Sequence, residues 1–185
     1  KAYLLRDGVP IADVTGKVAY DDYAALGNTT YVVRVMNASD NFADSNTSSV
    51  LVSVDYAALA AVDALDATIS MNMKANGQPA VTRQKELLSD SQYYAGREYP
   101  VGTFSEFSHE SYAPSFYYTS VEDFAKLETL INRRRTVLYR DRYGNKFYGT
   151  VTAVNHTQEN SMIIFTLAVS RVDYVEAISY AEVST

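Results

Sequence analysis

The 185-residue sequence contains no cysteine, no tryptophan and four prolines. The absence of cysteine excludes disulfides, thiolate zinc sites, iron–sulfur clusters and cysteine nucleophiles, so stability must come from packing. No apolar run reaches the roughly 18 residues that a membrane-spanning helix needs. The first ten residues have neither an initiator methionine nor the apolar core of a signal peptide. We therefore expect a piece of a longer protein with no membrane partner.

Catalytic signatures are also missing. The two histidines, His109 and His156, lie far apart in the sequence, which favours surface or hydrogen-bonded roles over general-base or ligand roles. No nucleophile elbow, HExxH zinc motif, Gly-rich phosphate loop or dinucleotide fingerprint is present. The acidic and amide residues at 40–46 suit a turn better than a calcium loop. The sequence predicts no enzyme, no catalytic residue, no metal and no cofactor. A carboxylate-only active site is the weakest alternative.

The composition is marked by an excess of acidic residues and by many tyrosines. The net charge of −6 argues against bulk attraction to nucleic acid or to an anionic membrane. Sixteen tyrosines stand against seven phenylalanines. Tyrosine suits half-buried strands, and it is also enriched at protein interfaces because its ring buries area while its hydroxyl stays hydrated. A β-sheet surface is the simpler interpretation, and a dedicated contact surface is the other.

The first 54 residues show short strands separated by turns. Asp7-Gly8 lies between two apolar runs, and this dipeptide accepts the positive φ angles of a tight hairpin turn. Residues 30–35 alternate, with Tyr31, Val33 and Val35 on one face, and a turn-rich stretch leads into a further strand at 49–54.

The segments YLLRDGVPIA, TTYVVRVMN and DSNTSSVLVSV, in this order, resemble the latter half of a fibronectin type III module. Such modules carry a tyrosine at the start of the strand that Thr30–Val35 would occupy. The resemblance covers residues 1–54 and implies a truncated module whose early strands precede Lys1. It implies a partial sandwich with a display role and no chemistry of its own.

Residues 55–66 are rich in alanine, the best helix former, and are interpreted as a linker or short helix. A second domain is expected over residues 67–185. It begins with an alternating strand at Thr68–Met73. The Tyr- and Ser-rich stretch from Ser89 to Tyr118 predicts short strands or an extended arm.

The strongest single element follows at Ser120. Apolar residues recur at helical spacing from Val121 to Ile131, Ser120 suits the N-cap, and Arg133 to Arg135 would close the helix at its negative end. Strands are expected at 137–140, 146–154 and 162–169. The predicted class is mainly β with one α-helix, the second domain being a β-sandwich or barrel against which the helix packs.

The segment from Glu122 to Ile178 is similar to C-terminal parts of bacteriophage tail proteins of the tail-tube, distal-tail and baseplate-hub group. The matching positions are Leu138, Tyr139, Arg140, Asp141, Gly144, Phe147, Gly149, Val151, Val169, Asp173 and Tyr174. The resemblance implies a structural component of a phage or prophage tail that acts by self-association and by docking to neighbouring tail proteins. It implies a virion location after assembly in the bacterial cytoplasm, with nucleic acid present only as passing cargo.

Candidate interface residues follow from this resemblance and from the basic cluster that stands out in an acidic chain. Arginine and tyrosine are common interface anchors, and ion pairing between subunits is the favoured role for the arginines. Helix capping is an alternative for the first three. The candidates are Arg133, Arg134, Arg135, Arg140, Arg142, Tyr117, Tyr118 and Tyr143.

A second hypothesis makes the chain a bacterial surface or secreted β-module that binds carbohydrate or protein through a tyrosine-rich face. The absence of tryptophan, which offers the largest ring for stacking on a sugar, makes this hypothesis the less favoured one. The face would consist of Tyr93, Tyr94, Tyr99, Tyr112, Tyr117 and Tyr118.

Overall fold

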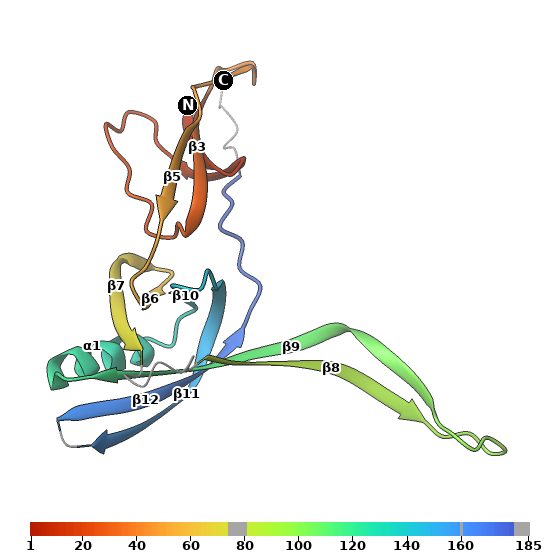
Figure 1. The fold of residues 1–185 in the computed structure, drawn as a ribbon. Helices are drawn as coiled ribbons and strands as arrows, with labels where there is room; N and C mark the ends of the chain where they lie inside the picture. Colours follow the sequence, from red (N-terminus) through yellow and green to blue (C-terminus); the bar gives the residue numbers. More distant parts are fainter. Residues whose placement is uncertain (74–80, 160, 180–185) are drawn as a thin grey trace. The chain divides into compact units, whose positions relative to one another are not determined.

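The computed structural model describes residues 1–73, 81–159 and 161–179. It confirms a mainly β protein, with one helix in the described part of the chain (Figure 1). Two compact units emerge, and the chain passes between them more than once. Unit 1 consists of Lys1–Asp55, Arg140–Lys146 and Asp173–Thr185, and unit 2 consists of Tyr56–Tyr139 and Phe147–Val172.

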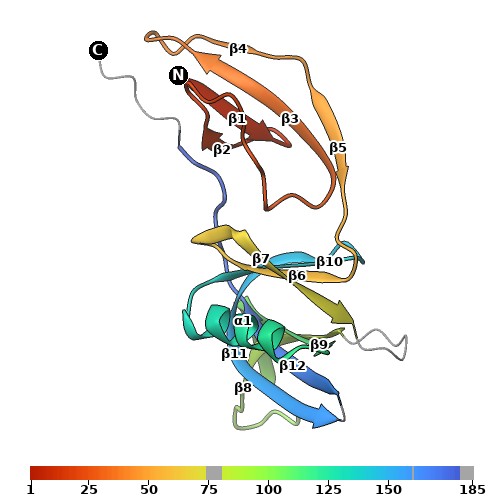
Figure 2. The ribbon, with the colours of Figure 1, turned by 90° about the vertical axis from the view of Figure 1, so that its left-hand side faces the viewer.

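Unit 1 is built on an antiparallel sheet (Figure 2). The strands run in the order β2-β1-β3-β4, and β5 pairs with another part of the long strand β3. Their bounds are Ala2–Arg6 for β1, Val9–Asp13 for β2, Gly27–Met36 for β3, Phe42–Asp44 for β4 and Ser48–Val52 for β5.

The predicted first hairpin is confirmed. Asp7 and Gly8 have φ angles of 50° and 82°, the positive values that the tight turn requires. The Asp7 carboxylate also accepts hydrogen bonds from the Thr30 backbone N–H at 2.8 Å and the Thr30 hydroxyl at 2.9 Å. The turn residue therefore also ties the hairpin to β3.

Unit 2 is a small barrel. Pairing runs in the order β12-β11-β10-β6-β7-β9-β8, and β12 also pairs with β9, so that all of these strands except β8 form a closed ring. The bounds are Ala57–Ala61 for β6, Ala64–Met73 for β7, Val81–Gln92 for β8, Val101–Tyr118 for β9, Val137–Asp141 for β10, Lys146–Glu159 for β11 and Met162–Arg171 for β12.

The alanine-rich stretch is a strand, contrary to the linker or short helix expected at residues 55–66. All five residues of β6 are buried, and Leu59 lies opposite Ile69 of β7. Helix propensity is a weak prior that tertiary contacts override. Small side chains fit where β6 is covered on both faces.

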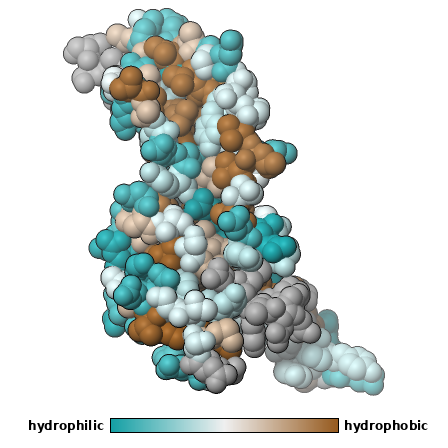
Figure 3. All heavy atoms as spheres, turned by 60° about the vertical axis from the view of Figure 1, so that its left-hand side comes forward, coloured by the Kyte–Doolittle hydropathy of each residue, from teal (hydrophilic) through white to brown (hydrophobic). Residues whose placement is uncertain are grey.

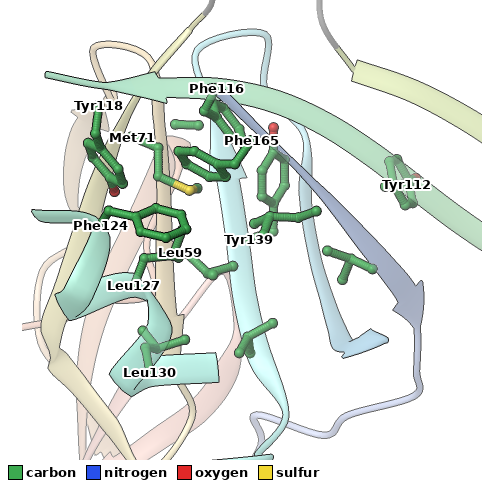
Figure 4. Packing of buried hydrophobic residues seen from close by; sticks show 14 of the residues in the cluster. Leu59, Met71, Tyr112, Phe116, Tyr118, Phe124, Leu127, Leu130, Tyr139 and Phe165 are labelled. Carbon is green, nitrogen blue, oxygen red and sulfur yellow. The ribbon is translucent and has the colours of Figure 1, made fainter. Parts of the chain in front are cut away.

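Aromatic rings fill the barrel (Figure 4). Phe165 is central, with ring centroids 5.7 Å from Phe116, 5.2 Å from Tyr118 and 5.8 Å from Phe124. Strand β12 alternates strictly, with every second residue from Ile163 to Val169 buried. The strand predicted at 162–169, after a polar turn, is confirmed.

Helix α1, Val121–Asn132, packs against the barrel with Phe124, Leu127 and Leu130, which confirms the predicted helix. Ser120 has extended backbone geometry but makes no side-chain capping bond. In the described part of the chain, no helix has the length and apolar character that crossing a bilayer requires.

Candidate interaction surfaces

The hairpin of β8 and β9 extends away from its barrel (Figure 1). The last pair between β9 and β12 joins Ser111 to Ser170, whereas β8 and β9 stay paired as far as Gln92 and Val101. We call residues 85–110, which lie beyond that last barrel pair, the arm. Of the two alternatives for the stretch from Ser89 to Tyr118, short strands or an extended arm, the structure confirms the extended arm.

The arm is exposed along its length. From Lys85 to His109 every side chain that the structure describes is exposed except the half-buried Val101. The exposed side chains include large apolar ones: Tyr93 at 82%, Tyr99 at 73% and Phe107 at 77% of full exposure. A two-stranded hairpin alone is marginally stable in water. The arm thus offers aromatic surface without the burial that usually stabilises a strand.

The root of the arm, in contrast, is fixed by Glu110. This residue is only 8% exposed. Its carboxylate accepts hydrogen bonds from Arg83 of β8, from Arg171 of β12 at 2.8 Å and from the Tyr112 hydroxyl at 3.0 Å. Burial acts to raise the pKa of Glu110, but the hydrogen bonds from Arg171 and Arg83 outweigh it and hold the pKa below the usual value. Glu110 is ionised at neutral pH and joins three strands.

Tyr112 adds packing at the same place. Its ring stacks on that of Phe147 with centroids 3.9 Å apart and planes inclined by 17°. In Figure 4 it lies on β9 apart from the other labelled rings. The exit of β9 from the barrel is therefore held by both an ionic cluster and a ring stack.

Unit 1 contains a groove of about 680 Å³ between its sheet and the segment that leads from β2 to β3. Tyr20 and Tyr23 of this segment are 41% and 43% exposed. The ammonium of Lys17 lies 5.6 Å from the centroid of the Tyr20 ring. The lining residues are Leu4, Val14, Lys17, Val18, Ala19, Tyr20, Asp21, Asp22, Tyr23, Tyr31 and Val33.

Asp22 fixes the floor of this groove. Its carboxylate accepts hydrogen bonds from Arg6 at 2.8 Å, the Tyr31 hydroxyl at 2.9 Å and the Ala24 backbone N–H at 2.9 Å. Burial acts to raise the pKa of Asp22, but the bonds from Ala24 and Arg6 lower it overall. Burial and the bond to Asp22 raise the pKa of Tyr31 to about 12. Both carboxylate oxygens of Asp22 accept hydrogen bonds. The neighbouring Asp21 is exposed, and its carboxylate accepts a long hydrogen bond of 3.5 Å from the Tyr23 hydroxyl.

Apolar side chains also reach the surface of unit 1. Figure 3 shows hydrophobic residues gathered on the face of this unit that it presents. The exposed apolar side chains of the unit include Val9, Val18, Val35, Phe42, Val50 and Leu51.

The predicted arginines belong to both units, Arg133, Arg134 and Arg135 to unit 2 and Arg140 and Arg142 to unit 1. Arg133 and Arg135 lie 3.8 Å from Asp63 in unit 2. The three arginines directly follow the last residue of α1, and Arg133 is its C-cap residue, whose backbone N–H donates to the Leu130 carbonyl at 3.3 Å. Arg134 then has a φ of 52°, the left-handed conformation that often ends a helix, so the helix ends where the arginines predicted it to end.

The other arginines belong to unit 1. Arg140 is buried and donates a hydrogen bond to the Ala25 carbonyl at 3.0 Å, which makes it a packing residue of its own unit. Arg142 is exposed, with its guanidinium 5.5 Å from the ring centroid of the exposed Tyr143. Arg142 and Tyr143 keep the accessibility that an interface role requires.

The tyrosines do not form a single face. Tyr112 and Tyr118 are buried, and the Tyr118 hydroxyl donates to the Ser70 carbonyl at 3.0 Å. Tyr117 is half-buried, and Tyr93, Tyr94 and Tyr99 lie exposed near the arm tip. Because ring positions alternate along β9, residues predicted to act together point to opposite faces. Of the six tyrosines that the carbohydrate- or protein-binding hypothesis groups together, only Tyr93, Tyr94 and Tyr99 are exposed.

Sequence reasoning missed Glu110 and its partners. Arg171 lies 61 positions from Glu110 along the chain, and no local pattern relates them. Polar and apolar residues show little alternation along the arm, so the sequence did not indicate where its strands begin and end.

Comparison of the sequence with protein-family models and with curated proteins gives no match. Within residues 1–73, 81–159 and 161–179, no group of three or more His, Cys, Asp or Glu side chains has the arrangement that would hold a metal ion.

Proposed function

We propose that this protein is a structural component of a phage or prophage tail that works by self-association and by docking to neighbouring tail proteins. The arm supports this proposal most strongly. It has a rigid root and an exposed aromatic surface, a combination suited to reaching a second molecule. Tyrosine and phenylalanine are the side chains that anchor interfaces when a partner covers them.

The backbone of the arm supplies a second means of contact. Among the described residues β8 pairs with β9 alone, so its other edge carries N–H and C=O groups that no strand satisfies. Such an edge is a template for strand addition by another chain. The fixed root lowers the conformational entropy that the arm loses on binding.

Deleting the arm tests the proposal. Glu86 and His109 lie directly opposite each other, so residues 87–108 can be replaced by Asn-Gly, a dipeptide suited to a two-residue hairpin turn. The variant keeps Glu110, Arg83 and Arg171. We expect the full chain to form oligomers in light scattering over a concentration series, and the variant to remain monomeric with unchanged thermal unfolding of its barrel.

The opposite results are equally clear. A full chain that stays monomeric at all concentrations contradicts self-association. An arm-deleted variant that assembles as well as the full chain shows that another surface is responsible.

A further inference from the structure

About half of the described basic side chains of this acidic protein have an acidic partner in their own unit. Among the described residues these pairs include Arg34 with Asp44 at 2.8 Å and Lys126 with Asp123 at 2.8 Å. The remaining basic residues in such pairs are Arg6, Arg83, Arg133, Arg135, Lys146 and Arg171. These pairs hold eight of the fifteen described Lys and Arg side chains, which leaves a limited set of exposed cations for a carboxylate of another molecule.

Arg97 at the arm tip is one of them. Its guanidinium lies 5.9 Å from the centroid of the Tyr94 ring, and its side chain is exposed. The Arg97 backbone N–H donates to the Tyr94 carbonyl at 3.3 Å, and Gly96 supplies the positive φ of 85° that this turn needs. The tip is thus an ordered turn that presents one cation beside exposed rings.

The groove of unit 1 has the complementary chemistry. Asp21 in the groove lining is exposed, and its carboxylate accepts a long hydrogen bond of 3.5 Å from the Tyr23 hydroxyl. The chain itself places the Lys17 ammonium against the Tyr20 ring, which shows that this wall accepts a cation. Val18 in the lining is fully exposed, so an incoming ring would bury apolar surface that water now covers.

We propose that this groove receives the arm tip of a second copy, with the partner's Arg97 paired to Asp21 over the Tyr20 ring. The inference rests on the proposed self-association and names its two surfaces. Asp22 cannot take this role because Arg6 and Tyr31 occupy its oxygens. Each copy carries both a tip and a groove, so the contact can close as a reciprocal two-fold dimer or continue from copy to copy into a ring or an open chain.

Cross-linking between single-cysteine variants tests the contact, because the natural chain contains no cysteine. Ala19→Cys places a thiol in the groove and Glu98→Cys places one at the tip. We expect a short bismaleimide to join the two variants into a dimer when they are mixed. Ser39→Cys, on an exposed turn of unit 1 outside the groove lining, is the matched control and should not cross-link to Glu98→Cys.

A charge exchange provides the second test. We expect Arg97→Glu and Asp21→Lys each to weaken self-association at least about tenfold, since each places like charges together. The double variant should recover most of the loss. Circular dichroism of each single variant checks that it folds, and Asp21→Asn replaces Asp21→Lys if the latter does not.

The outcomes separate this inference from the proposed function. Oligomers that form without the cross-link, and that the single charge variants leave unchanged, overturn the tip-to-groove contact while self-association stands. A natural chain that does not associate overturns both.

Discussion

At the residue scale, Glu110 is the side chain on which the root of the arm depends. Three donors from β8, β9 and β12 converge on its carboxylate. Hydrogen bonds to a charged group contribute about 1.5–3 kcal/mol each when a buried acceptor would otherwise lack partners. The acidic side chain thus stabilises the place where the sheet leaves the barrel, although no neighbouring residue in the sequence marks it.

Replacing Glu110 by glutamine gives a pH-dependent result. The folded carboxyl has a lowered pKa, so its contribution to stability is complete above the unfolded value of about 4.3 and is lost as pH falls through the folded pKa. We expect Glu110→Gln to lower the free energy of unfolding by about 2 kcal/mol at pH 7. The difference between natural chain and variant should shrink on acidification, as measured by urea unfolding from pH 7 to pH 3.

The control is Glu106→Gln, an exposed acid on the arm. It should leave the free energy of unfolding unchanged within error at both ends of the pH range. A difference for Glu110→Gln that stays constant with pH would contradict the role of its charge.

At the scale of elements, sequence patterns predicted those helices and strands that have a clear apolar periodicity or a clear flanking turn. Helix α1 was predicted because its apolar residues recur at helical spacing, and β12 because an apolar run follows a polar turn. Strand β6 was missed because five buried residues in a row show no alternation and alanine favours helix. The length of the arm was not predictable, since a hairpin exposed on both faces has no pattern that fixes its register.

The close approach of β11 and β12 depends on Gly149. A Cβ at this position would lie 2.6 Å from Cγ1 of Val169 and 2.7 Å from the backbone oxygen of Ser170. The backbone contact cannot be relieved by a rotamer change. We expect Gly149→Ala to lower the free energy of unfolding by about 1–3 kcal/mol in urea titration.

Gly102 provides the matched comparison in the same barrel-and-arm unit. A Cβ there meets no atom within 4 Å, and its φ is not in the left-handed region. Gly102→Ala should be neutral or slightly stabilising, because it reduces the freedom of the unfolded chain. Equal effects of the two substitutions would show that the strands adjust without cost.

At the scale of the whole molecule, unit 1 is assembled from three separate parts of the sequence. Arg6 of β1 forms ion pairs with Asp22 and with Glu176, and Glu176 also receives Lys146 at 2.7 Å. The sequence boundary expected after residue 54 therefore misses two segments that complete this unit. Sequence patterns could not supply them, because the ion pairs join residues far apart in the chain.

Glu176→Ala tests whether the late segment stabilises unit 1. Burial, and then the positive charge of Arg6, lower the pKa of Lys146 to about 8, so removing the Glu176 carboxylate leaves two crowded cations. We expect a loss of about 1–3 kcal/mol confined to unit 1, since each lost bond joins charged groups. Hydrogen exchange should quicken in β1 and β3 and stay unchanged in β12.

Glu128→Ala, an exposed position on α1, serves as the control. Equal acceleration in β12 would mean that the two units unfold as one cooperative body, and local exchange would mean that the network binds only its own unit.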